Sequence, residues 1–156
     1  RDNTIIHDKG YVYKINELRI KKKFIDILKD INKKHIYIFI VTNQSGIGRG
    51  IFTEKQFFNF QLELKKRLCS LDIFIDDVQF CPFHEKAKLK IYRKKTNLRK
   101  PGNGMLLNLF QDWSLIKKRS IMIGDQISDE ICANKTGIKF MNIDDVNLRK
   151  LNKILN

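Results

Sequence analysis

Residues 42 to 50 combine small polar side chains, three glycines and one arginine directly after an apolar run. Hydroxyl and amide groups can bind phosphate oxygens, and glycines let the backbone come close to a ligand. An arginine adds a fixed positive charge with several hydrogen-bond donors. We therefore expect this turn to bind an anion such as a phosphate. The candidate binding side chains are Thr42, Asn43, Gln44, Ser45 and Arg49.

Two acidic elements have the residue types of a magnesium site. Asp2 and Thr4 form a D-x-T element, and Asp125 and Asp129 follow a second apolar run. Mg²⁺ usually takes one or two carboxylates together with phosphate oxygens and water. Taken singly, each element also fits a helix cap or a surface turn.

A basic turn, Arg99-Lys-Pro-Gly102, could supply positive charge to the same chemistry. Lys100 could neutralise a phosphoryl group or a carboxylate nucleophile. A basic turn of this kind is ordinarily solvated surface. Its significance comes from the order of the four elements, each of which stands at the end of a predicted strand or loop.

The elements that must position these residues alternate between strand and helix. Hydrophobic spacing predicts helices at 19–34, 53–71, 103–113, 128–136 and 146–155, strands at 36–42, 78–80, 120–123 and 138–143, and a long loop at 81–99. This alternation predicts an α/β fold with a doubly wound, mostly parallel, Rossmann-like sheet. We expect one domain over residues 1–156. In such sheets ligands bind at the carboxyl ends of the strands.

The composition limits the partners. The net charge of +14 raises nucleic acid as a partner, but the basic residues are scattered over several predicted helices, which favours a solvated surface. No apolar run approaches the ~20 residues that a membrane-spanning helix needs. Three widely spaced cysteines fit reduced thiols in the cytoplasm. We therefore expect a cytoplasmic protein without membrane or nucleic-acid partners.

The order D-x-T, strand-T-N, R-K-P and G-D-x-x-x-D resembles the haloacid dehalogenase superfamily of aspartyl-phosphate phosphatases. The strings at 8–15, 42–50 and 99–101 are similar to D-glycero-D-manno-heptose 1,7-bisphosphate phosphatases and to the related histidinol phosphatases. The resemblance extends from Arg1 to about Ile143. It implies the fold of this superfamily, here without a large cap domain, and a magnesium-dependent phosphatase.

The resemblance also implies roles for single residues. Asp2 matches the general acid/base, and the nucleophilic Asp would directly precede Arg1. We therefore expect the given sequence to lack the nucleophile and the first strand that carries it. Mg²⁺ would be held by Asp125, the backbone carbonyl of Asp2 and the nucleophile. Thr42 and the backbone amide of Asn43 would bind the phosphoryl group, with Lys100 opposite.

Arg49 and Arg99 are the candidates for a second, non-transferred phosphate of the substrate. Gln44 and Ser45, in the string that is specific to this branch, complete the predicted substrate-binding set.

One departure from the family concerns zinc. The family often carries a zinc loop, C-x-H followed by C-x-C before the R-K-P turn. Here Cys81 is kept, Thr96 and Leu98 replace the later cysteines, and His84 lies one position off. Because structural zinc takes four ligands, we expect no structural zinc and a half-buried Cys81 thiol.

The leading hypothesis is a Mg²⁺-dependent monomeric phosphatase that removes the 7-phosphate of D-glycero-D-manno-heptose 1,7-bisphosphate, on the route to the heptose of lipopolysaccharide. A second is a histidinol-phosphate or other small-metabolite phosphatase. A third takes the charge of +14 as a sign of a polynucleotide 3′-phosphatase. A phosphate-binding pseudoenzyme is the non-enzymatic alternative.

Overall fold

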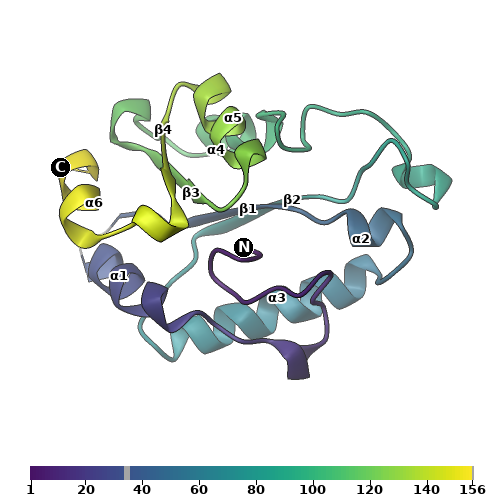
Figure 1. Ribbon diagram of the computed structural model, residues 1–156, viewed down its shortest axis with the longest axis horizontal. Helices are drawn as coiled ribbons and strands as arrows, with labels where there is room; N and C mark the ends of the chain where they lie inside the picture. Colours follow the sequence, from purple (N-terminus) through teal and green to yellow (C-terminus); the bar gives the residue numbers. More distant parts are fainter. Residues whose placement is uncertain (34–35, 156) are drawn as a thin grey trace.

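Parallel strands with helices packed against them make up the computed structural model, which describes residues 1–33 and 36–155 (Figure 1). In chain order the elements are α1 (Lys22–Lys33), β1 (Phe39–Asn43), α2 (Ser45–Gly48), α3 (Glu54–Cys69), β2 (Asp77–Cys81), α4 (Gly104–Asp112), β3 (Ile121–Gly124), α5 (Ile127–Thr136), β4 (Lys139–Asn142) and α6 (Leu148–Leu155). Single turns of 3-10 helix lie at Ile15–Glu17, Lys90–Tyr92, Lys117–Arg119 and Ile143–Asp145. Among the described residues, no helix combines the length and apolarity needed to cross a membrane.

The predicted α/β class with parallel strands is confirmed. β1 pairs in parallel with β2, from Phe39 opposite Asp77 to Asn43 opposite Cys81. β3 pairs in parallel with β4. The structure differs from a single continuous sheet, because the described strands form two separate pairs.

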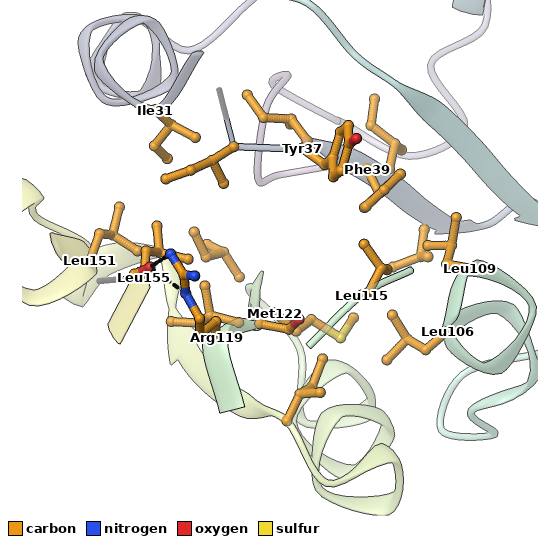
Figure 2. Close-up of a pocket in the computed structure, with 18 of the residues that line it drawn as sticks. Ile31, Tyr37, Phe39, Leu106, Leu109, Leu115, Arg119, Met122, Leu151 and Leu155 are labelled. Atoms are coloured by element: carbon orange, nitrogen blue, oxygen red, sulfur yellow. Dashed lines mark hydrogen bonds between the residues drawn. The ribbon is translucent and has the colours of Figure 1, made fainter. Parts of the chain in front are cut away.

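An apolar slot with a volume of about 390 Å³ lies between the two strand pairs. It is lined along its length by β1 and β3, and helices α1, α4 and α6 contribute further side chains. Figure 2 shows Ile31 and Phe39 on one side of the slot, with Met122 and Leu155 on the other. The slot therefore separates two strands that are each paired on their other edge.

Local signals in the sequence place several element ends correctly. Thr53 caps α3 in a capping box: its hydroxyl accepts a hydrogen bond from the Gln56 backbone at 3.2 Å, and the Gln56 side chain accepts one from the Thr53 backbone at 2.8 Å. Gly137 ends α5 in the left-handed conformation, with φ of 77°. The first predicted helix begins at Lys22, three residues later than expected, and its predicted last residue lies outside the described part of the chain.

The core lies between α3 and the strands. One face of α3 is fully buried, as the spacing of its apolar residues predicts. The side chains on this face are Phe57, Phe60, Leu64 and Leu68. A second apolar cluster joins β3 to α4 and α5. These packed helices fix the strands, and the strands in turn fix the polar turns at their ends.

Candidate active site

The side chain of Asp2 meets the end of β1. Gln44 Nε2 donates to Asp2 Oδ2 at 2.8 Å, and Thr42 Oγ1 donates to the same oxygen at 3.3 Å. Arg1 holds the other carboxylate oxygen, with Nε 2.7 Å from Asp2 Oδ1. Thr42 and Gln44 are buried, whereas Asp2 keeps a quarter of its side chain exposed. The site therefore presents a fixed but reachable carboxylate.

Lys100 reaches the same edge from the basic turn. Its Nζ lies 2.6 Å from Asp129 Oδ1 and donates to the Val41 carbonyl at 3.2 Å. Both charged side chains are nearly covered, at 11% and 5% exposure. The ammonium group thus contacts Val41, which lies near the end of β1, and Asp129, which follows β3. The carboxyl ends of β1 and β3 therefore lie at one edge.

Asn43 connects the two halves of the site. Its Oδ1 accepts a hydrogen bond from the Lys100 backbone, and its Nδ2 donates to the Lys100 carbonyl, both at 3.0 Å. Successive side chains along a strand point to opposite faces of the sheet. Thr42 and Gln44 accordingly contact Asp2, while the side chain of Asn43 braces the basic turn.

Asp125 occupies the first position after β3, and its Oδ2 accepts a hydrogen bond from Gln126 Nε2 at 2.7 Å. Direct contacts thus join Asp2 to Thr42 and Gln44, and Lys100 to Asn43, and the three partners at 42–44 are consecutive residues at the end of β1. Asp125 shares their sheet edge and has no direct contact to Asp2 among those found in the described residues.

The donor set of this edge fits magnesium. Asp125 is partly buried and Asp2 partly exposed, so both offer hard oxygen donors that water and a phosphate can reach. Among the described residues, no group of three His, Cys, Asp or Glu side chains is placed to hold a metal ion. An ion here would complete its shell with phosphate oxygens and water, which is the usual habit of Mg²⁺.

Basic side chains gather beside this edge. Burial lowers the pKa of the half-buried Arg99, and the positive charge of Arg49 acts in the same direction. Burial is also the largest cause that lowers the pKa of His84, and the positive charges of Arg99 and Arg49 lower it further. The charge of Arg49 therefore acts on Arg99 in the folded chain, and both charges act on His84, although the two arginines are 50 residues apart in sequence. Ser45 begins α2, and its carbonyl accepts from the Arg49 backbone at 2.9 Å.

The loop after β2 is held by protein contacts. The Leu89 backbone donates to the Gly48 carbonyl at 3.0 Å, and Arg93 Nε donates to the Ala87 carbonyl at 2.8 Å. Lys94 Nζ lies 3.9 Å from the centre of the Phe83 ring. A methyl group on Gly48 would come within 2.7 Å of the Pro82 carbonyl oxygen, which shows how closely the loop packs on α2.

Cys81 and His84, the two residues considered for zinc, each make a hydrogen bond to the protein backbone. Cys81 is fully buried, which corrects the expected half-buried thiol, because β2 carries it into the core beside the loop. Its Sγ donates to the Phe83 carbonyl at 3.9 Å, and burial raises the pKa of the Cys81 thiol. His84 uses Nδ1 to accept a hydrogen bond from the Lys86 backbone at 2.9 Å.

Two functional contacts were missing from the sequence interpretation. The sequence predicts Asp129 only as the second member of an acidic pair with Asp125, without a role of its own, although Gly124 leaves the space for its side chain: a Cβ there would lie 2.3 Å from Asp129 Oδ2. Gln44 was assigned to the substrate, whereas its amide is turned toward Asp2 and Thr42. No local signal in the sequence distinguishes these two uses of a glutamine.

Comparisons with known proteins identify the family of this chain. Residues 71–143 match the family of haloacid dehalogenase-like hydrolases. A D-glycero-beta-D-manno-heptose-1,7-bisphosphate 7-phosphatase of Haemophilus influenzae is 36% identical over 83% of this chain and 70% of its own. One from Rhodopseudomonas palustris is 37% identical over 88% and 77%.

Two solved structures share the fold. A HAD-like phosphatase structure from Mesorhizobium loti has a TM-score of 0.84 and 29% identity, over 88% of this chain and 66% of that one. The D,D-heptose 1,7-bisphosphate phosphatase of B. bronchiseptica, solved with magnesium and phosphate, has a TM-score of 0.80 at 19% identity, over 90% and 75%.

Proposed function

Since this chain belongs to the family of the D-glycero-beta-D-manno-heptose-1,7-bisphosphate 7-phosphatases, within the haloacid dehalogenase-like hydrolases, we propose that it is a Mg²⁺-dependent phosphatase that removes the 7-phosphate of this heptose bisphosphate. The observation that carries the proposal is the meeting of Asp2, Thr42 and Lys100 at one sheet edge. These groups are a proton carrier, a hydroxyl donor and a fixed positive charge. Together they suit a phosphoryl group and its leaving oxygen.

Asp2 is the proton carrier of the proposed reaction. Its carboxyl group protonates the leaving sugar oxygen and later takes a proton from the attacking water. Thr42 Oγ1 and the backbone amide of Asn43 donate hydrogen bonds to the phosphoryl oxygens. The positively charged ammonium group of Lys100 faces the same phosphoryl group, and its ion pair with Asp129 holds it in place. The nucleophile expected from the resemblance is a carboxylate directly before Arg1.

Magnesium fits the proposed site through Asp125 and the backbone carbonyl of Asp2. When bound, it screens the negative charges of the carboxylates and the phosphate from one another. The expected carboxylate before Arg1 would attack phosphorus as the bond to the sugar oxygen breaks, and water would then release phosphate from it. The residues of this chain would orient the substrate and move the proton in both steps.

We also propose that a strand fills the apolar slot between β1 and β3, parallel to both, and that residues preceding Arg1 supply it. Arg1 lines the slot, and Asp2 follows it at the carboxyl end of β1, where a parallel strand would end. Such a strand would place its last residue beside the proton carrier. Amide hydrogen exchange of the natural-length protein tests this, because the slot-facing amides of β1 and β3 should then be strongly protected. Rapid exchange of those amides would exclude an inserted strand.

The second phosphate of the substrate is assigned to Arg49 and Arg99. The positive charge of Arg49 acts on Arg99, and an anion between the two guanidinium groups would relieve this repulsion. Ser45 and the backbone of the glycine-rich turn lie between this pair and Thr42 in the sequence. A sugar carrying two phosphates would therefore be recognised at both ends.

A phosphate-release assay on the natural-length protein with Mg²⁺ tests the function. Heptose 1,7-bisphosphate, histidinol phosphate and a 3′-phosphorylated oligonucleotide are compared by kcat/KM, with the Asp2→Asn variant as the blank. The highest value is expected for the heptose bisphosphate. A higher value for either other substrate would reassign the enzyme, and no release from any of them would leave a phosphate-binding protein.

We propose further that the enzyme acts as a cytoplasmic monomer. All three cysteines are free thiols, two of them buried, as suits a reducing compartment. Sedimentation velocity at micromolar concentration measures the oligomeric state directly. A stable dimer would contradict this part of the proposal.

A further inference from the structure

We propose that Gln44 is a positioning residue, which holds the proton-transferring carboxyl group of Asp2 and does not contact the substrate. The inference rests on the proposed function for its kinetic consequence, although the contacts themselves do not depend on it. Gln44 is only 4% exposed, and its Nε2 lies 2.8 Å from both Asp2 Oδ2 and Thr42 Oγ1. Because the side chain is buried and its amide nitrogen already has two hydrogen-bond partners, it is poorly placed to bind a sugar phosphate.

The amide group of Gln44 has one hydrogen for each of these partners. Thr42 in turn directs its own hydroxyl to Asp2 Oδ2 at 3.3 Å, so donors converge on this oxygen from two sides. The other oxygen is held by the guanidinium group of Arg1, with Nη2 at 2.6 Å. Both ends of the carboxylate are therefore fixed, and its plane is set by three side chains.

The backbone makes Gln44 a rigid support. Its N–H donates to the Cys81 carbonyl at 2.8 Å, which extends the β1–β2 pairing one residue beyond the strand. Its carbonyl accepts from the Ile47 backbone at 3.1 Å, at the start of the glycine-rich turn. The side chain thus projects from a point held on both sides, which is what accurate positioning of a proton carrier requires.

A positioning role has a kinetic signature different from that of a substrate contact. Misorienting Asp2 weakens proton transfer in the transition state and leaves ground-state binding of the phosphate nearly unchanged. It therefore lowers kcat with little change in KM, whereas losing a substrate contact raises KM. Since the hydrogen bond is made to a charged group, the expected loss in kcat is about 10- to 100-fold.

The test uses the natural-length protein and the variants Gln44→Met and Gln44→Glu. Methionine keeps the length of the side chain but donates no hydrogen bond, and glutamate keeps the shape but turns a carboxylate toward Asp2. Both variants should lower kcat for heptose 1,7-bisphosphate by about 10- to 100-fold, with KM changed by less than about threefold.

Gln61→Met is the matched control. Gln61 is the other buried glutamine whose amide is described, and neither its Nε2 nor its Oε1 has a hydrogen-bond partner among the described residues. The same substitution there should leave kcat unchanged. If Gln44→Met does not fold, as judged by circular dichroism and thermal unfolding, the nearly isosteric Gln44→Glu carries the test.

Crystal structures of the wild type and the variants separate failure of the inference from failure of the proposed function. The expected result is an Asp2 carboxyl group that turns away from Thr42 in both Gln44 variants and stays in place in Gln61→Met. This readout needs no substrate, so it decides the role of Gln44 even if the wild type releases no phosphate. An unmoved Asp2, or an increase in KM at constant kcat, would overturn the inference.

Discussion

Lys100 and Asp129 form a covered ion pair, with Nζ 2.6 Å from Oδ1, at the point where the ends of β1 and β3 approach each other. The pair connects a turn in the middle of the chain to the first turn of α5. It lies next to Asn43, which hydrogen-bonds both backbone groups of Lys100. The position of Lys100 is thus determined by contacts to β1 and to α5.

Replacing Asp129 should therefore damage both stability and activity. Asp129→Ala leaves the Lys100 ammonium group covered and without its counter-charge, which costs about 3–5 kcal/mol in comparable buried pairs. The free energy of unfolding, measured by urea denaturation, should fall by that order. Glu63→Ala, which breaks the partly exposed Glu63–Arg67 pair on α3, is the control and should cost less than about 0.5 kcal/mol. Equal losses in the two variants would contradict a special role for the covered pair.

The proton carrier is tested by an isosteric change. Asp2→Asn keeps the shape of the side chain and can still accept a hydrogen bond from Gln44, but it cannot transfer a proton. General acid–base catalysis contributes about 10²- to 10⁴-fold, so kcat for the heptose bisphosphate should fall by that range while KM stays close to the wild-type value. Steady-state phosphate release measures both. A residual kcat within about threefold of the wild type would remove Asp2 from the mechanism.

The sequence predicts those parts of the fold that depend on local patterns. The alternation of strands and helices is predicted and confirmed, and so are the helix beginning near Thr53 and the helix end near Thr136. Short-range rules explain both ends, because Thr53 forms a capping box and Gly137 adopts the left-handed conformation. Helix α2 was not predicted, because it has four residues and two of them are glycines. Its form depends on the loop that packs against Gly48.

The roles of buried polar residues depend instead on tertiary contacts. Gln44 and Asn43 are neighbours in a polar string, and only the pairing of β1 shows that one faces Asp2 and the other Lys100. The sequence predicts a half-buried Cys81 thiol because the zinc ligands are incomplete, but Cys81 is the last residue of β2 and is fully buried. Groups distant in sequence, such as Arg49 and Arg99, act on each other electrostatically only in the folded chain.

The cysteines provide a test of burial and pKa together. Burial raises the pKa of Cys132 to about 11 and also raises that of Cys81, so both remain protonated thiols at neutral pH. Because the thiolate is the reactive form, labelling by iodoacetamide at pH 8 should modify the exposed Cys69 first. Labelling of Cys132 in the folded protein should rise only as the pH approaches 11. Peptide mass spectrometry after timed labelling measures the order, and early modification of Cys132 would show that α5 does not protect it.

Arg49 and Arg99 should determine the preference for a substrate with two phosphates. Arg49→Met and Arg99→Met remove a positive charge and keep the aliphatic part of the side chain, so they should raise KM for heptose 1,7-bisphosphate by about 10-fold or more. KM for the corresponding 7-monophosphate should change little, because this substrate has no second phosphate to lose. Arg149→Met, on the exposed face of α6, is the matched control for loss of charge. Equal increases in KM for both substrates would place the two arginines at the transferred phosphate instead.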